Sequence, residues 1–388
     1  MKKFLLLSIL IASLMAACKP EATASRITSP IPTAISTIAH KSVAISPLSP
    51  IATDTPASKF LPGLIYTIDG QRGLWLVNAN GQPRLLTDQV DAILSPDQQF
   101  VLHGIISQIQ CEPNGPVCAD QDIGVTNIAT GDSHNLTKTP DKIEGFFQWW
   151  PANPNLIVFN VKPEWTPWTG YLATIDVDGT NYHVIDSEIG SNTPAALSPD
   201  GQTIAYDRRG VPSLYRLNDG SQPIPLEPFG LTFNQATNPK WSPDGQMLAW
   251  SVYGDEPGTR GWSGIAVLNL PQQEGFLLHR HSIQGFSEVY TQFAWSPDGK
   301  WLAVLDWAKP EASVWVIRID GSEEYHLGDA ELPIWSPDGR QLVFSRLQPE
   351  ANSPYETKIM LVGVGEWQLH QLDLPRGARV KGWVTLQP

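Results

Sequence analysis

One ten-residue pattern recurs along the chain and limits its fold more than any other feature of the sequence. It reads WSPDGQMLAW at 241–250, WSPDGKWLAV at 295–304 and WSPDGRQLVF at 335–344. Proline favours the second position of a type I turn, aspartate suits the third, and glycine tolerates the left-handed conformation that follows. Because a short β-rich apolar run comes next, each copy predicts a strand, a tight turn and a second, buried strand.

Six copies of this pattern are found when the chain is aligned on the residue before the turn. Four copies keep the letters SPDG, one has SPDQ, and one is degraded to WPAN. A further pair of strands follows each copy, and one more pair precedes the first copy; four of these seven pairs turn at Asn-Gly or Asp-Gly, a strong hairpin signal. Four strands repeated every 40 to 55 residues are typical of a β-propeller. The aligned residues are Leu94, Trp149, Leu197, Trp241, Trp295 and Trp335.

The two ends of the repeat region complement each other. A seventh hairpin, within residues 64–86, lacks an inner strand, and Trp383 near the other end falls on the repeat period. We therefore predict an all-β fold, a seven-bladed β-propeller over residues 60–388, in which N-terminal strands and residues 378–386 share one blade. Such closure removes exposed sheet edges. A six-bladed ring with ragged ends is the alternative.

The first residues have the pattern of a targeting segment. Lys2 and Lys3 precede a short apolar stretch, and small residues lead to Cys18. This pattern resembles a bacterial lipoprotein signal, which implies a signal peptide at 1–17 and diacylglycerol on the Cys18 sulfur. The resemblance implies an extracytoplasmic protein, lipid-anchored to the cell membrane or the outer membrane. An ordinary secretory peptide with an incidental cysteine is the alternative.

A linker is expected between the lipidated cysteine and the propeller. Alanine, serine, threonine and proline fill 26 of the 40 positions from 19 to 58, without glycine or aromatic residues. Such a composition cannot bury enough apolar surface to order itself. We therefore predict that residues 18–59 form a disordered, largely extended tether.

Charge excludes one class of partner. The chain has 26 basic and 39 acidic residues, a net charge of −13, and the predicted propeller alone has 20 against 37. A domain of this sign is repelled by phosphate backbones and by anionic lipid heads. We expect no nucleic-acid partner and no membrane contact other than the lipid anchor.

Two further cysteines stand in the stretch CEPNGPVC, at Cys111 and Cys118. In an exported protein such a pair favours a disulfide over a metal site. Asn-Gly and two prolines between them allow the chain to turn. We predict a Cys111–Cys118 disulfide that stiffens a long surface loop.

The repeats can now be compared with a known family. The W-S-P-D-G copies resemble the WD40-like propeller repeats of TolB-like proteins and of propellers attached to dipeptidyl-peptidase-type enzymes, over residues 64–386. The resemblance implies the fold. TolB itself adds an N-terminal α/β domain, whose place a tether takes here, so its role with envelope partners is not implied.

Candidate catalytic and metal-binding groups are sparse. No G-x-S-x-G nucleophile elbow occurs, since the nearest text, at 261–264, lacks the spacing. Metal ions need converging ligands, and the fourth-strand histidines are expected to diverge around the rim and face water. His279 and His281 can share a strand face, but two ligands are not enough. We therefore predict no enzyme activity, no cofactor and no metal. The fourth-strand histidines are His134, His183, His279, His326 and His370.

Topology assigns the long loops to one face of the propeller. Loops between second and third strands lie opposite the tight turns, and variable loops on a rigid scaffold are where function concentrates. Aromatic rings beside polar groups suit peptide side chains or sugars; the alternative is that the rings pack the loops onto the blades. The candidate binding residues are Trp165, Trp168, Tyr253, Asp255, Glu256, Arg260, Trp262, Asp306 and Trp307.

These expectations together describe a monomeric, lipid-anchored scaffold. We expect the loop face to bind an envelope protein or peptide without catalysis. The alternative is a carbohydrate-binding or carbohydrate-cleaving propeller, a lyase or a glycosidase, that uses the same loops.

Overall fold

The computed structural model describes 28 β-strands and no helix in the residues that it places. All of these residues belong to the unit His40–Pro388, and the other unit, Met1–Ala39, lies outside them. None of them forms a helix long and apolar enough to cross a bilayer. The predicted signal peptide, Cys18 and the linker also fall outside. The described residues are 61–89, 92–110, 117–139, 142–150, 153–163, 170–189, 194–209, 211–217, 222–226, 228–283, 292–306, 313–329, 331, 333–350 and 353–386.

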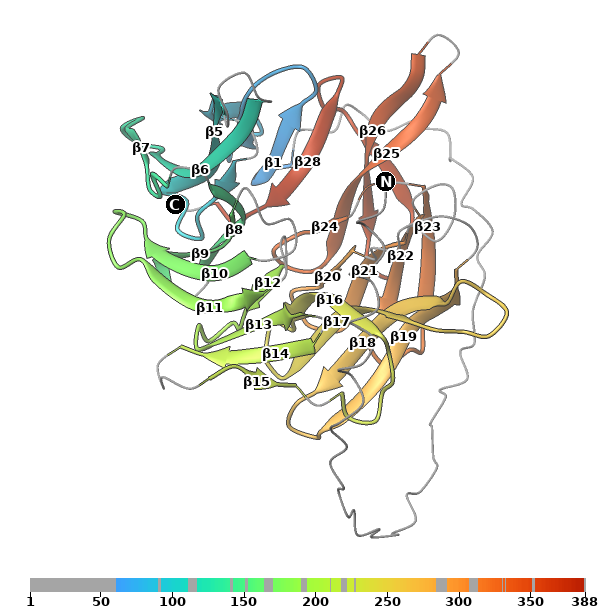
Figure 1. Cartoon of the computed structure of the whole chain (residues 1–388). Helices are drawn as coiled ribbons and strands as arrows, with labels where there is room; N and C mark the ends of the chain where they lie inside the picture. Colours follow the sequence, from blue (N-terminus) through green and yellow to red (C-terminus); the bar gives the residue numbers. More distant parts are fainter. Residues whose placement is uncertain are drawn as a thin grey trace, which may run out of the picture. The chain divides into compact units, whose positions relative to one another are not determined.

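The strands form antiparallel meanders, one after another along the chain (Figure 1). The first half contains β1 (Leu64–Ile68), β2 (Leu74–Val77), β3 (Pro83–Thr87), β4 (Ile93–Leu94), β5 (Phe100–Gln110), β6 (Val117–Asn127), β7 (Ser133–Asn135), β8 (Lys142–Trp150), β9 (Asn153–Pro163), β10 (Gly170–Asp176), β11 (His183–Ile189), β12 (Ala195–Leu197), β13 (Thr203–Arg208), β14 (Val211–Arg216) and β15 (Ile224–Pro225). The second half contains β16 (Gln235–Trp241), β17 (Met247–Gly254), β18 (Trp262–Asn269), β19 (Glu274–Ser282), β20 (Gln292–Trp295), β21 (Trp301–Asp306), β22 (Ser313–Arg318), β23 (Glu324–Asp329), β24 (Ile334–Trp335), β25 (Gln341–Glu350), β26 (Ser353–Gly363), β27 (Leu369–Leu372) and β28 (Ala378–Trp383).

The closing sheet has the predicted composition. Its strand order is β28-β1-β2-β3, so the last strand lies beside the first (Figure 1). The pairing runs from Leu64 opposite Trp383 to Ile68 opposite Ala378. Glycine is required at position 63, where φ is +86° and a Cβ would lie 2.0 Å from the Val384 carbonyl oxygen. The prediction that the C-terminal segment supplies the missing inner strand is confirmed.

Hydrogen bonding does not separate all of the predicted blades. Five sheets have four strands, and one has eight, made of two antiparallel groups, β4–β7 and β8–β11. The two groups are joined by a parallel pairing of β6 with β8 at Gln121 and Ile143. The all-β propeller fold is therefore observed, while the count of seven blades stays a prediction.

Apolar side chains between successive sheets hold the circle together. Cluster by cluster, buried residues of one sheet pack on those of the next, as Trp250 packs near Ala205 and Phe293 near Ile265. The last such cluster joins Val343 and Ile359 to Leu64 of the first sheet. Because every sheet is covered on both faces, the second and third strands are almost continuously buried, as the apolar runs predicted.

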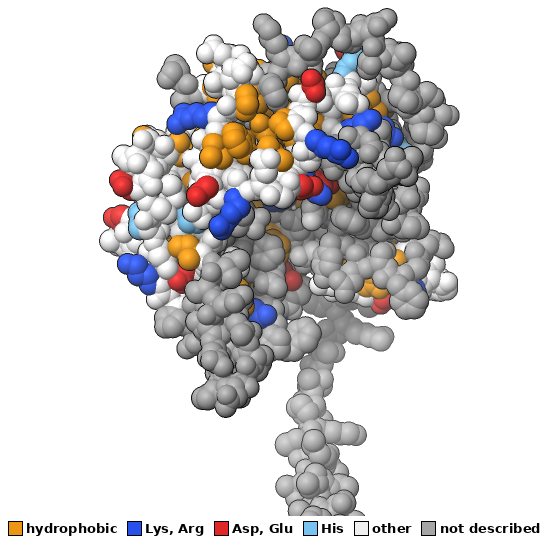
Figure 2. Space-filling view, turned by 90° about the horizontal axis from the view of Figure 1, so that it is seen from above, with side chains coloured by type: hydrophobic (Ala, Val, Ile, Leu, Met, Phe, Trp, Pro, Cys, Tyr) orange, Lys and Arg blue, Asp and Glu red, His pale blue; other side chains and the backbone are white. Residues whose placement is uncertain are grey.

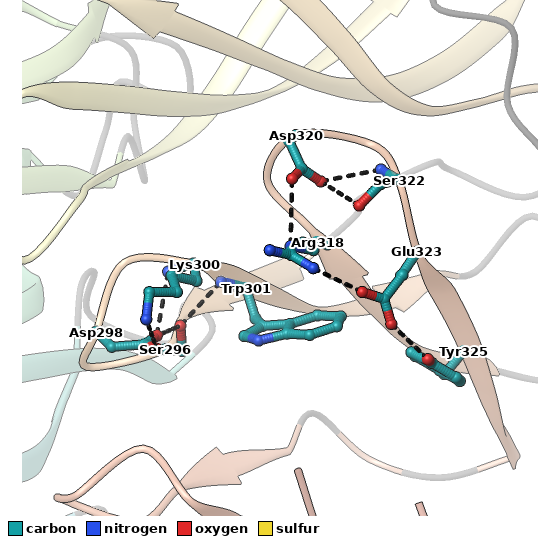
Figure 3. A network of polar contacts seen from close by, with 9 residues as sticks. All are labelled: Ser296, Asp298, Lys300, Trp301, Arg318, Asp320, Ser322, Glu323 and Tyr325. Carbon is teal, nitrogen blue, oxygen red and sulfur yellow. Dashed lines mark hydrogen bonds and ion pairs between the residues drawn. The ribbon is translucent and has the colours of Figure 1, made fainter. Parts of the chain in front are cut away.

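The repeated serine and aspartate organise each turn between a first and a second strand. The Ser242 hydroxyl donates to the Asp244 carboxylate at 2.6 Å and accepts from the Met247 backbone N–H at 2.8 Å. The same carboxylate accepts from the Gln246 N–H at 3.0 Å. Figure 3 shows the equivalent turn at Ser296. The pattern recurs because the buried hydroxyl satisfies backbone and side-chain groups together.

The repeated tryptophan connects neighbouring sheets. The Trp241 Nε1–H donates to the Ala196 carbonyl at 3.1 Å, and the Trp295 Nε1–H donates to the Lys240 carbonyl at 3.0 Å. In both cases the acceptor belongs to the first strand of the preceding sheet. Trp335 makes the same contact with its preceding sheet, and Trp149 makes it with the Ile93 carbonyl of β4, the first strand of the preceding four-stranded group within the eight-stranded sheet. The first strands therefore lie next to one another around the centre, which explains why the sequence keeps an indole there.

Replacing Ser242 by alanine tests the role of the turn. The variant leaves the Met247 N–H and the Asp244 carboxylate without their buried partner, so we expect a loss of about 1–3 kcal/mol in the free energy of unfolding. Urea unfolding measures it. The matched control is Ser322→Ala, which removes a serine–aspartate hydrogen bond of 2.6 Å from an exposed hairpin turn and is expected to cost less than about 0.5 kcal/mol. Equal losses in both variants would contradict this account.

Candidate functional site

The hairpin of β17 and β18 carries five of the candidate residues. Its strands pair from Met247 opposite Asn269 to Gly254 opposite Trp262. A Cβ at Gly254 would lie 2.4 Å from the Trp262 ring, and one at Gly261, where φ is +115°, would lie 2.6 Å from the Gly254 carbonyl oxygen. Glycine at both positions therefore lets the indole lie across the end of the hairpin.

Polar contacts hold the loop at the end of this hairpin. The Tyr253 hydroxyl donates to the Arg260 carbonyl at 2.7 Å. The Thr259 hydroxyl donates to the Glu256 carbonyl at 2.9 Å and accepts from the Gly261 N–H at 3.0 Å. The loop therefore has a defined conformation, and the Tyr253 ring contributes to it.

Trp262 is covered by charged residues. Its side chain is buried, and the Arg280 guanidinium lies 4.9 Å from the ring centroid. Arg280 also forms an ion pair with Glu256 at 3.0 Å. The Ser282 hydroxyl donates to the Glu256 carboxylate. This hydrogen bond, together with Arg280, outweighs the opposing effect of burial and holds the pKa of Glu256 below its usual range. The outer surface of this hairpin is therefore ionic, and the indole supports it from beneath.

A bulge in β19 brings two histidines together. Ser263 pairs with His281 and Ile265 with Leu278, so two residues of β19 lie opposite Gly264. His279 has a φ of +49°, and a Cβ on Gly264 would lie 3.1 Å from the Leu278 carbonyl oxygen. Bulges of this kind redirect side chains. Here the centroids of the His279 and His281 rings lie 5.3 Å apart.

Both histidines contact a carboxylate of the next sheet. Asp306, the last residue of β21, lies with Oδ2 3.3 Å from His279 Nε2 and with Oδ1 3.2 Å from His281 Nε2. On its other side, His279 Nδ1 lies 2.6 Å from Glu324 Oε1 on β23. His281 Nδ1 lies 3.2 Å from the His279 carbonyl oxygen, and Ser263 Oγ lies 2.9 Å from His281 Nε2. We call His279, His281 and Asp306 the inter-sheet triad.

The electrostatics of the triad are dominated by the two carboxylates. Burial lowers the pKa of His279, but hydrogen bonds and charge from Asp306 and Glu324 outweigh it and raise the pKa to about 9. The surroundings of His279 are aromatic. The centroid of the Trp315 ring lies 5.2 Å from that of the His279 ring, and Trp315 stacks on His326 with ring centroids 4.4 Å apart. A cationic group at this position is therefore strongly favoured.

The structure groups the candidate residues in two places. Tyr253, Glu256, Arg260 and Trp262 belong to the β17–β18 hairpin, where Asp255 is exposed. Asp306 lies instead on the neighbouring sheet, in the inter-sheet triad. Trp165, Trp168, Trp307 and Cys111 fall outside the described residues, so the full binding face and the Cys111–Cys118 disulfide stay predictions.

The histidine expectation requires a correction. Fourth-strand histidines were expected to face water, which is wrong for His279, whose side chain is only 8% exposed. The bulge turns it toward the next sheet, where Asp306 and Glu324 meet it. The prediction was based on two histidines of one strand and did not include the carboxylates of the next sheet that contact them. One sequence pattern could have identified the site. The fourth strand of one repeat contains His-x-His, and the second strand of the following repeat ends in an aspartate.

Comparisons with known proteins give distant structural likenesses. No protein-family model matches the chain, and no curated protein matches it. A putative TolB from Agrobacterium tumefaciens is 20% identical, over 66% of this chain and 90% of its own, with a TM-score of 0.41. TolB from Acinetobacter baumannii is 14% identical, over 82% and 81%, with a TM-score of 0.44. An oligogalacturonate lyase in complex with manganese is 14% identical, over 82% and 86%, with a TM-score of 0.48. The fold described above rests on strand pairing and packing in this chain.

Proposed function

We propose that this chain is a non-catalytic binding scaffold, held on the extracytoplasmic side of a membrane by a lipid on Cys18. Its partner would be an envelope protein or peptide that contacts the loops between second and third strands. The β17–β18 hairpin carries the proposal, because it presents charges of both signs on a loop whose conformation is held by internal hydrogen bonds. Preorganised loops bind with a smaller entropic cost.

The charge pattern supports a protein partner over a polyanion. Asp255 and Arg260 are exposed, and Arg280 is 45% exposed beside Glu256. Figure 2 shows a different part of the surface, on the side of β1 and β28, where lysine, arginine and acidic side chains also lie around a group of hydrophobic side chains. Mixed charge around apolar contacts is common in protein interfaces and sets their specificity.

A glycan partner is the alternative that the sequence raised. Sugars stack on exposed aromatic faces, whereas Trp262 is buried beneath Arg280. This hairpin therefore favours a protein or peptide, and a carbohydrate site would have to use other loops.

Charge reversal on the hairpin tests the proposal. We expect the Asp255→Lys/Arg260→Glu variant of the full chain to lose at least about tenfold in affinity for a partner cross-linked to the wild type in intact cells, since like charges placed across an interface cost several kcal/mol. Affinity of the purified pair measures it. The matched control is Asp132→Lys/Lys300→Glu, which reverses the same charges on turns that connect other strand pairs.

Two outcomes would contradict the proposal. One is equal affinity in the hairpin variant and in the control. The other is selective binding of the wild type to one glycan class on a glycan array, with no protein partner, which would establish the carbohydrate alternative.

A further inference from the structure

The inter-sheet triad has the geometry of a metal site. The candidate ligand atoms of His279, His281 and Asp306 all lie within 4.8 Å of one another. Zinc bonds of about 2.0–2.2 Å at tetrahedral angles place ligand atoms about 3.3–3.6 Å apart. The measured separations between Asp306 oxygens and the two Nε2 atoms, 3.3 and 3.2 Å, are close to that spacing. Small adjustments of these side chains would admit the ion.

The groups behind the ligands are those that metal sites use. Metal-binding histidines usually donate the other ring N–H to a carboxylate or a carbonyl, which orients the ring. His279 Nδ1 has the Glu324 carboxylate at 2.6 Å, and His281 Nδ1 has a backbone carbonyl at 3.2 Å. Both arrangements leave Nε2 directed at Asp306. This second observation is independent of the spacing of the ligand atoms.

Two carboxylates converge on one of the histidines. Asp306 Oδ2 lies 3.3 Å from His279 Nε2, and Glu324 Oε1 lies 2.6 Å from Nδ1. On binding at Nε2, a divalent ion would displace any proton from this nitrogen to solvent, and the Asp306 carboxylate would bind the ion directly.

We propose that His279, His281 and Asp306 bind one divalent transition-metal ion, of which zinc fits best. Two imidazole nitrogens and one carboxylate suit zinc, whereas calcium and magnesium prefer sites made of oxygen ligands alone. Glu324 positions His279 through Nδ1. The ion would connect β19 of one sheet to β21 of the next. The inference does not depend on the proposed binding partner.

Metal binding by the full chain tests this site. The protein is purified without a histidine tag, stripped with a chelator and titrated with zinc chloride by calorimetry, with the metal content measured after dialysis. We expect one zinc ion per chain and a rise in the melting temperature on zinc addition. Cobalt should replace zinc and give the absorption of a tetrahedral cobalt centre.

Variants assign the ligands. Glu324→Gln should raise the dissociation constant by about 10–100-fold, and His281→Gln and Asp306→Asn should raise it further. His183→Gln, on the fourth strand of another sheet, and Cys111→Ser/Cys118→Ser should bind zinc as the wild type does. Near-ultraviolet circular dichroism identifies any variant that fails to fold. If the histidine variant fails, the zinc affinity of Asp306→Asn, which preserves the side-chain shape, decides whether Asp306 is a ligand.

Two results would overturn the proposal. One is a folded wild-type chain that binds none of zinc, cobalt, nickel and copper stoichiometrically, which would leave the triad as an ion-pair cluster between sheets. The other is unchanged zinc affinity in folded His281→Gln and Asp306→Asn variants.

Discussion

Deletion of residues 378–388 is expected to abolish cooperative folding of the propeller. The deletion removes β28, whose pairing with β1 closes the first sheet. It also removes Arg379, which pairs with Asp69 at 2.7 Å and contacts Glu331 of the preceding repeat. The free energy of unfolding of a folded protein is about 5–15 kcal/mol. Loss of a whole strand and its buried apolar contacts is expected to remove most of it.

The deletion is measured by urea unfolding and by size-exclusion chromatography. The truncated chain should lose its sharp unfolding transition and associate through the exposed edge of β1. Deletion of residues 21–58, within the predicted linker, is the control, and it should leave the unfolding midpoint unchanged. A truncated monomer within about 1 kcal/mol of wild-type stability would show that closure contributes little.

The Trp250→Ala substitution is expected to cost about 3–5 kcal/mol of stability, the range for large aromatic residues removed from a core. Trp250 is 1% exposed at the centre of β17, among Ala236, Leu248 and Trp262. Its Nε1 has no hydrogen-bond partner among the described residues, so the loss comes from packing alone.

Two further variants isolate this effect. Trp250→Phe, which removes part of the volume and no hydrogen bond, should lose less than half of the alanine value. Val211→Ala, at a residue that is 47% exposed, should change stability by less than about 0.5 kcal/mol. Chemical denaturation monitored by fluorescence and circular dichroism compares the variants. Similar losses at positions 211 and 250 would refute the packing argument.

The repeat predicted most of the fold because its residues interact with residues that are close in the sequence. Serine, proline and aspartate form a turn through contacts within about five residues, so their structure can be read from one copy. Closure could also be predicted, because Trp383 continues the repeat period. The number of blades could not, because a single parallel pairing between β6 and β8 depends on how two neighbouring meanders approach each other.

The inter-sheet triad was beyond sequence reasoning for a related reason. His279 and Asp306 are 27 residues apart, and His279 and Glu324 are 45 apart. Their meeting depends on the bulge opposite Gly264 and on the packing of two consecutive sheets. The pattern His-x-His followed by an aspartate could have identified these residues as candidates, but it does not predict that their side chains meet. The assumption that fourth-strand side chains point outward also argued against such a meeting.

The mixed origin of the closing sheet has a consequence for biosynthesis. A ribosome makes β1 long before β28, so the opening strand must wait, with one edge unsatisfied, until nearly all of the remaining polypeptide has emerged. Every other four-stranded meander can assemble from contiguous chain as it appears. The sheet that closes the propeller therefore forms only after β28 has been synthesised, later than the other four-stranded meanders.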